Sequence, residues 1–142
     1  MILYLDTTAF VKLFVREEFS PLVHAQMAMV DVVATSRVSY AEACDALARC
    51  RHDGHLSDDD VEHARDRLDQ VWSQFAVIDI NERAAADVTV RHGLRGYAAL
   101  HIAAALDLRS QASAVPLVFC SFDERQVQVA EAEGLAVIPQ AA

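Results

Sequence analysis

Short apolar segments alternate with longer helical segments along most of the chain, and this alternation constrains the fold more than any other feature. Five segments have the length and apolar content of buried strands: residues 2–5, 31–36, 76–80, 115–121 and 135–139. Buried strands that are separated by helices predict a parallel sheet with helices on both faces, joined by right-handed crossovers. The predicted fold class is therefore α/β.

Helix start and stop signals divide the residues between these strands. Pro21 lies in the first turn of one segment, Ser57 precedes a run of acidic residues, and Asn81 is a capping residue. Gly54 and Gly93 are typical helix ends. We therefore expect helices at 7–17, from 20 onward, and at 37–54, 57–75, 81–93, 94–106 and 123–134. No linker or repeat interrupts this order, so we expect one domain over residues 1–142.

The composition disfavours several classes of protein. Although 54% of the residues are hydrophobic, no run reaches the roughly 18 uncharged residues that a membrane span needs. The first residues lack the basic region and cleavage site of a signal peptide, and the three irregularly spaced cysteines indicate reduced thiols. We therefore expect a cytoplasmic protein with no membrane partner. The net charge of −9 disfavours nucleic-acid binding unless metal ions occupy the site.

Acidic residues stand where two of the predicted strands end. Asp6 directly follows the first strand, and Asp123 follows the fourth strand two residues after Ser121. Glu42 lies in the helix after the second strand, where small neighbours allow its carboxylate to point toward the sheet edge. Helix capping also explains Asp6 and Asp123, and solvent exposure also explains Glu42. Functional groups of parallel sheets gather at the carboxyl ends of the strands, so these acids are candidates for one site.

Carboxylates at one sheet edge would require a cation, because like charges raise one another's pKa. Oxygen ligands suit Mg²⁺ or Mn²⁺. Such ions lower the pKa of a bound water and stabilise both oxygens of an in-line phosphoryl displacement. The pattern therefore predicts metal-assisted phosphodiester hydrolysis, with Asp6, Glu42 and Asp123 as metal ligands.

Four segments in this order resemble the PIN domain, and more narrowly the VapC-type ribonuclease toxins of prokaryotic toxin–antitoxin pairs. The segments are ILYLDTTAFVKLF, SYAEACDAL, LRGYAALHIAAAL and FCSFDERQ. The resemblance implies a PIN-like three-layer sandwich with a five-stranded parallel sheet in the order 3-2-1-4-5. It also implies a Mg²⁺- or Mn²⁺-dependent endoribonuclease that cleaves tRNA or ribosomal RNA. Asp6, Glu42 and Asp123 match the family's first, second and last acids, and Ser121 matches the hydroxyl of its S/T-x-D motif.

One acid of that family pattern is missing. The third acid lies in a segment similar to L-R-x-Y-D-A-L-H, and this position is Ala98 here. Asp107 does not replace it, because it lies about 13 Å further along the predicted helix. Either an active toxin was silenced by engineering, or the acid was lost naturally. We expect a chain that folds normally, binds the metal poorly and cleaves RNA little or not at all.

The resemblance also implies protein partners. VapB-like antitoxins wrap such toxins with their C-terminal segment, and toxin homodimers join through antitoxins into hetero-oligomers. Phe10, Leu13 and Phe14 give the first helix more apolar surface than one sheet contact requires. Core packing explains most of this surface, and the excess makes these three residues candidates for antitoxin binding. Four arginines are candidates for RNA phosphate contacts: Arg16, Arg37, Arg91 and Arg95.

Other interpretations remain open at this point. The chain is alternatively a PIN-like module that binds RNA or protein without catalysis, with alanine as its natural residue 98. A haloacid-dehalogenase-like phosphatase is disfavoured, because its second acid would stand at Thr8. The cysteine and histidine residues at 44–55 match no structural zinc pattern. His101 is either a hydrogen-bonded core residue or a proton carrier.

Overall fold

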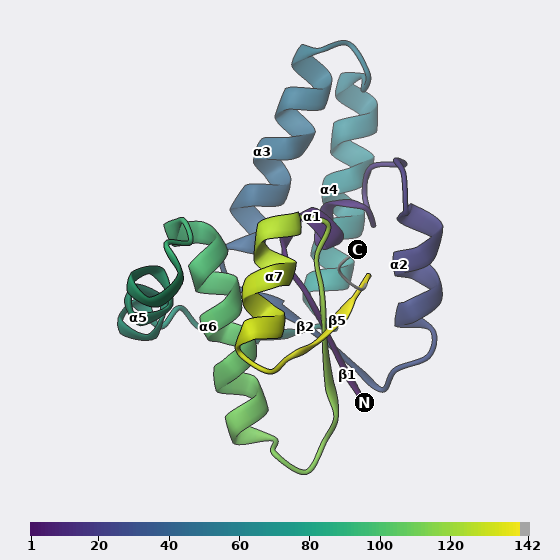
Figure 1. The fold of residues 1–142 in the computed structure, drawn as a ribbon. Coiled ribbons are helices and arrows are strands. Elements are labelled where there is room, and N and C mark those ends of the chain that lie inside the picture. Colours follow the sequence, from purple (N-terminus) through teal and green to yellow (C-terminus); the bar gives the residue numbers. More distant parts are fainter. Residues whose placement is uncertain (140–142) are drawn as a thin grey trace.

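Five parallel strands form one central sheet in the computed structural model, which describes residues 1–139 (Figure 1). The strands are β1 (Ile2–Leu5), β2 (Val32–Ser36), β3 (Ala76–Ile78), β4 (Leu117–Cys120) and β5 (Ala136–Ile138). Their order is β3-β2-β1-β4-β5, and each neighbouring pair is parallel. The predicted fold class and the strand order implied by the resemblance are both confirmed. The end of the expected domain, residues 140–142, lies outside the described residues.

Seven helices in the described chain surround this sheet. They are α1 (Thr7–Val11), α2 (Ser20–Met27), α3 (Ser39–His52), α4 (Asp58–Trp72), α5 (Glu82–His92), α6 (Gly96–Gln111) and α7 (Glu124–Ala132). One core cluster joins the sheet to α5, α6 and α7, and a second joins it to α1, α3 and α4. Figure 1 shows α3 and α4 side by side, extending beyond the end of the sheet.

The central strand β1 separates the two cores. Ile2 and Tyr4 pack with the cluster of α5, α6 and α7, whereas Leu3 and Leu5 pack with the other cluster. This alternation follows from the two-residue period of a strand, and both sides are apolar because helices cover both faces. No helix within residues 1–139 combines the length and the apolar character needed to cross a bilayer.

Two helices differ in length from the prediction. α1 ends at Val11, and the chain continues in tighter turns in which the amides of Leu13 and Phe14 donate to carbonyls three residues earlier. These turns bring both side chains into the core. α6 extends to Gln111 rather than ending at residue 106, since no glycine or proline interrupts it before Pro116.

Phe10 anchors the aromatic part of the second core. Its side chain is completely buried, and its ring meets Phe14, Trp72 and Phe75 edge-on at centroid distances of 5.0, 6.0 and 5.9 Å. Trp72 and Phe75 belong to the end of α4 and the turn after it. Phe10 therefore fastens α1 to α4, and it offers no surface to a partner in this structure.

We predict that Phe10→Ala destabilises the fold by about 3–5 kcal/mol, because it removes buried ring contacts and leaves a cavity. Urea unfolding followed by circular dichroism measures this change. Met29→Ala is the matched control, since Met29 is 77% exposed and its truncation should change the free energy of unfolding little. Equal effects of the two substitutions would contradict the assigned core role of Phe10.

Candidate functional site

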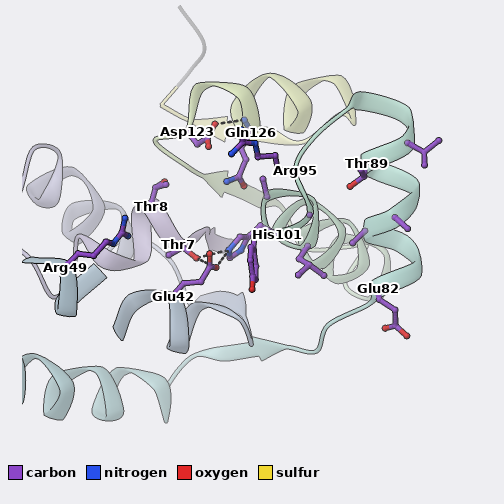
Figure 2. Close-up of a pocket in the computed structure, with 17 residues that line it drawn as sticks. Thr7, Thr8, Glu42, Arg49, Glu82, Thr89, Arg95, His101, Asp123 and Gln126 are labelled. Atoms are coloured by element: carbon purple, nitrogen blue, oxygen red, sulfur yellow. Dashed lines mark hydrogen bonds and ion pairs between the residues drawn. The ribbon is translucent and has the colours of Figure 1, made fainter. Parts of the chain in front are cut away.

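A cavity of about 940 Å³ opens near the carboxyl ends of β1 and β4, between α1, α3, α5, α6 and α7. Figure 2 shows the side chains that border it. Its border includes Thr7, Glu42, Ala98, His101, Asp123 and Gln126. Predicted candidates from distant parts of the chain, Glu42 and Asp123, thus border the same space.

Asp6 lies beneath this cavity and is completely buried. Its Oδ1 accepts hydrogen bonds from the Thr8 hydroxyl at 2.6 Å and from the Ala9 amide at 3.0 Å. Its Oδ2 accepts from the Ser121 hydroxyl at 2.6 Å and from the Gln126 side-chain amide at 3.0 Å. Four donors therefore hold one carboxylate and satisfy the acceptors that burial removes from water.

The electrostatic balance at Asp6 favours the protonated form relative to an exposed aspartate. Burial raises the pKa of Asp6, while nearby His101 and the hydrogen bonds from Ser121, Thr8 and Ala9 act in the opposite direction without cancelling the rise. A cation next to this carboxylate would favour its ionised form.

The turn between β4 and α7 is built around Ser121 and Asp123. The Ser121 hydroxyl accepts from the amide of Asp123 at 3.1 Å while donating to Asp6. Asp123 caps α7, because its Oδ1 accepts from the backbone amide of Gln126 at 3.1 Å. The amide of Phe122 also donates to the Thr8 hydroxyl at 2.8 Å. The capping explanation is thus correct for Asp123, and the cap places its carboxylate at the border of the cavity.

A second polar network holds Glu42 on the opposite side. Its Oε1 accepts a 2.5 Å hydrogen bond from the Thr7 hydroxyl and lies 3.3 Å from His101 Nε2. Partial burial acts to raise the pKa of Glu42, but the hydrogen bonds from His101 and Thr7 outweigh it and leave the pKa below its usual value. Glu42 is therefore an oriented, ionised carboxylate at neutral pH rather than a freely solvated one.

The hydrogen bonds also define the state of His101, which is buried at the centre of this network. Thr7 directs its hydroxyl hydrogen to Glu42, so its oxygen accepts from His101 Nε2 at 2.9 Å, and Nε2 carries a hydrogen. Nδ1 lies 2.9 Å from the Tyr4 hydroxyl. Burial, with Asp6 and Glu42 nearby, raises the pKa of Tyr4 well above its usual value, so Tyr4 is a neutral phenol.

Ala98 lies on the cavity wall, one turn of α6 before His101. No carboxylate projects from this position, and its methyl group packs against the core beneath α6. The position at which the resemblance implies a third acid is thus an apolar part of the cavity border.

The three predicted acids do not form one preformed metal cluster. Among residues 1–139, no group of three or more histidine, cysteine, aspartate or glutamate side chains lies close enough together to hold an ion. Glu42 and Asp123 nevertheless border one cavity with Asp6 buried beside it, and metal binding by the three acids stays a prediction. Separate donors hold two of these acids, since Ser121 donates to Asp6 and Thr7 donates to Glu42.

The four predicted arginines lie in three different places. Arg95 borders the cavity, as does Arg49, which the sequence did not single out. Arg37 pairs with Asp79 at 2.8 Å, and Arg91 pairs with Glu133, both at the exposed surface. Arg16 borders a different cavity.

That second cavity, of about 620 Å³, lies between the turns after α1, α2 and α4. Leu13 and Phe14 form part of its wall, although their side chains are largely buried. Lys12, Arg16 and Arg67 border it together with Glu17 and Asp60, and Lys12 pairs with Glu17 at 3.1 Å. Leu13 and Phe14 therefore border a groove, whereas the third predicted partner residue, Phe10, lies below the surface.

The sequence alone does not single out Tyr4 or Gln126. Tyr4 has the pattern of an ordinary strand residue, and Gln126 that of a surface position of an amphipathic helix. Tyr4 contacts His101 and Gln126 contacts Asp6, which are 97 and 120 positions away in the sequence. No short-range pattern carries this information.

Comparison with known proteins gives a consistent family. The PIN domain family model matches residues 3–132. Ribonuclease VapC45 from Mycobacterium tuberculosis (strain CDC 1551 / Oshkosh) is 30% identical over 141 residues, covering 97% of this chain and 95% of the relative. Ribonuclease VapC49 from strain H37Rv matches equally well.

The fold agrees with solved structures at lower identity. VapBC-1 from nontypeable Haemophilus influenzae aligns with a TM-score of 0.63 and 16% identity, covering 96% of this chain and 96% of that chain. VapC20 from M. tuberculosis, described as a Sarcin-Ricin loop cleaving toxin, aligns with a TM-score of 0.62 and 19% identity, covering 94% and 96%. From its matched family model, its 30% identical relatives and its strand order, the chain belongs to the PIN domain family and is homologous to the VapC ribonucleases of VapBC toxin–antitoxin systems.

Proposed function

We propose that this protein is a Mg²⁺- or Mn²⁺-dependent endoribonuclease toxin of a type II toxin–antitoxin pair, acting in the cytoplasm on tRNA or ribosomal RNA. The observation that carries the proposal is the cavity shared by Glu42 and Asp123, with Asp6 directly beneath, in a chain homologous to VapC ribonucleases. Family membership judged from the strand order alone would not identify which edge of the sheet carries the site.

The donor set around the cavity fits a hard divalent cation. Glu42 and Asp123 offer carboxylate oxygens, and the side-chain carbonyl of Gln126 is a buried oxygen without a hydrogen-bond donor. The buried carboxylate of Asp6 would contribute its negative charge, and a nearby cation would offset the free-energy cost of burying that charge. When bound, such an ion activates a water and stabilises the phosphoryl oxygens during hydrolysis. Ions of this kind retain several waters, so they do not need a closed cluster of carboxylates.

The chain's own residues would organise the substrate around this centre. Thr7 and His101 fix the direction of the Glu42 carboxylate, and Ser121 links Asp6 to the turn that carries Asp123. Arg95 at the cavity border would attract an RNA phosphate toward an otherwise acidic protein.

Ala98 weakens this catalyst in our proposal. An aspartate at this position would add negative charge to the cavity wall and strengthen cation binding. Alanine is well tolerated within α6, because it has the best helix propensity and its methyl group packs against the core. The proposed result is an intact fold with impaired metal binding and impaired cleavage.

We predict that Ala98→Asp increases Mn²⁺-dependent cleavage of total cellular RNA by about tenfold or more, as expected when a metal-site ligand is restored. RNA sequencing of cleavage ends with and without Mn²⁺ would measure the rate and locate the cut. Asp107→Ala is a composition control, since Asp107 lies elsewhere on α6 and bonds to Asn81. A folded Ala98→Asp chain that remains inert on RNA would overturn the nuclease proposal.

We further predict that Glu42→Gln removes most of the cleavage measured in the Ala98→Asp background. Glutamine has nearly the same shape and still accepts from Thr7, but it loses the negative charge that attracts the cation. Single-turnover rates at several Mn²⁺ concentrations separate weaker metal binding from slower chemistry. Glu62→Gln is the matched control, because Glu62 is an exposed residue of α4. Equal rates for the two variants would exclude Glu42 from the site.

A second candidate function is RNA or protein binding without cleavage. The observation that favours it is the combination of Ala98 with the absence of a preformed carboxylate cluster among residues 1–139. Retained RNA affinity with no cleavage, in both the parent chain and Ala98→Asp, would select this alternative. Cleavage by Ala98→Asp would reject it.

The proposed protein partner is a VapB-like antitoxin. Several solved neighbours are toxin–antitoxin complexes, which share this fold at 13–20% identity. The groove bordered by Leu13 and Phe14 combines apolar walls with charged residues of both signs, which suits an amphipathic segment. Assembly as a homodimer or as a toxin–antitoxin hetero-oligomer belongs to the same proposal, and co-purification with the product of an adjacent reading frame would test it.

A further inference from the structure

Gln126 carries an unsatisfied atom at the candidate site. Its side chain is only 5% exposed, yet its residue borders the cavity together with Glu42 and Asp123. The Oε1 atom is the single buried side-chain oxygen or nitrogen without a hydrogen-bond partner among residues 1–139. Buried polar atoms are nearly always paired, so this oxygen indicates a ligand of the site.

The contact with Asp6 fixes the orientation of the Gln126 amide. Gln126 Nε2 donates to Asp6 Oδ2 at 3.0 Å, and a carboxylate at this position requires a donor. Reversing the amide would place two acceptor oxygens against each other. The carbonyl oxygen is therefore the atom left without a partner, and Figure 2 shows Gln126 among the side chains that surround the cavity.

The surroundings of this oxygen favour a cation over an anionic or neutral ligand. Asp6 contacts the same side chain, Asp123 contacts the backbone amide of Gln126, and Glu42 borders the same cavity. Arg49 and Arg95 also border this cavity, but the atoms in direct contact with Gln126 belong to the carboxylates of Asp6 and Asp123. Amide carbonyl oxygens are accepted ligands of hard divalent cations.

We propose that Gln126 Oε1 is a ligand for the divalent cation of this site and offsets part of the loss of the acid at Ala98. The inference rests on the metal dependence of the proposed function. A neutral amide oxygen completes the oxygen set while adding no charge next to the buried Asp6. Gln126 thus has two separate roles: its nitrogen orients Asp6 and its oxygen binds the ion.

Two substitutions separate these roles in the 142-residue chain. Gln126→Leu removes both the amide donor and the oxygen, whereas Gln126→Glu removes the donor but keeps an oxygen at the same place. Gln128→Leu is the matched control, since Gln128 is an exposed residue of the same helix. Binding of Mn²⁺ alone, measured by calorimetry and by the electron paramagnetic resonance signal of free Mn²⁺, requires no RNA. Circular dichroism melting gives the folded fraction to which each affinity is referred.

We expect Gln126→Leu to weaken Mn²⁺ binding by about tenfold or more, a loss seen even when only an outer partner of a metal site is removed. Gln126→Glu should bind at least as tightly as the parent, and Gln128→Leu should match the parent. Unchanged binding by Gln126→Leu would overturn the inference, as would equal weakening in the leucine and glutamate variants, because only the contact with Asp6 would then matter.

The same titration distinguishes this inference from the proposed function. A parent chain that binds Mn²⁺ while Gln126→Leu binds equally well overturns the role of Gln126 and leaves metal-dependent hydrolysis standing. A parent chain that binds no Mn²⁺ overturns both.

Discussion

The arrangement of this protein's site depends on one buried carboxylate, that of Asp6. An isolated buried charge is strongly unfavourable, so the fold must surround it with donors or protonate it. It receives donors from α1, from the end of β4 and from α7. The same interactions therefore join the start of the chain to the β4–α7 segment, 115 to 120 residues further on. Moving either segment would remove donors from the buried carboxylate, and this couples the shape of the cavity to the stability of the fold.

Both polar networks of the site begin in the central strand and the turn after it. Tyr4 contacts His101, Asp6 contacts Ser121 and Gln126, and Thr7 contacts Glu42. Because β1 lies between β2 and β4 in the sheet, side chains at its end reach elements on either side. The strand order is thus a requirement of the site, and not only a property of the fold family.

The sequence predicts the architecture better than the site. Apolar segments of strand length and helix caps such as Ser57 are local signals, and the structure confirms both. The sequence alone is enough to select Asp123 and Glu42 as candidates, because a position at a strand end or on a narrow helix face is also a local signal. Gln126 is not found, since a glutamine in an amphipathic helix is ordinarily exposed and only its contact with Asp6, 120 residues away, reveals its burial. Phe10 is buried instead of being available to a partner, and the reason is related. Helical spacing shows that its side chain lies on an apolar face, but not that α4 packs against this face.

Charge explains why an alanine at position 98 suits the metal-free protein. Burial already raises the pKa of Asp6, and a further acid on the cavity wall would raise it more. Ala98 therefore causes less electrostatic repulsion in the metal-free fold than an aspartate would. An aspartate would bind a cation more tightly. Low repulsion in the metal-free fold and tight cation binding thus favour different residues at position 98. The neutral oxygen of Gln126, in our proposal, offers a ligand to the cation without adding a repulsive charge. In the proposed site fewer negative charges would hold the ion, so a higher free cation concentration would be needed to half-fill it.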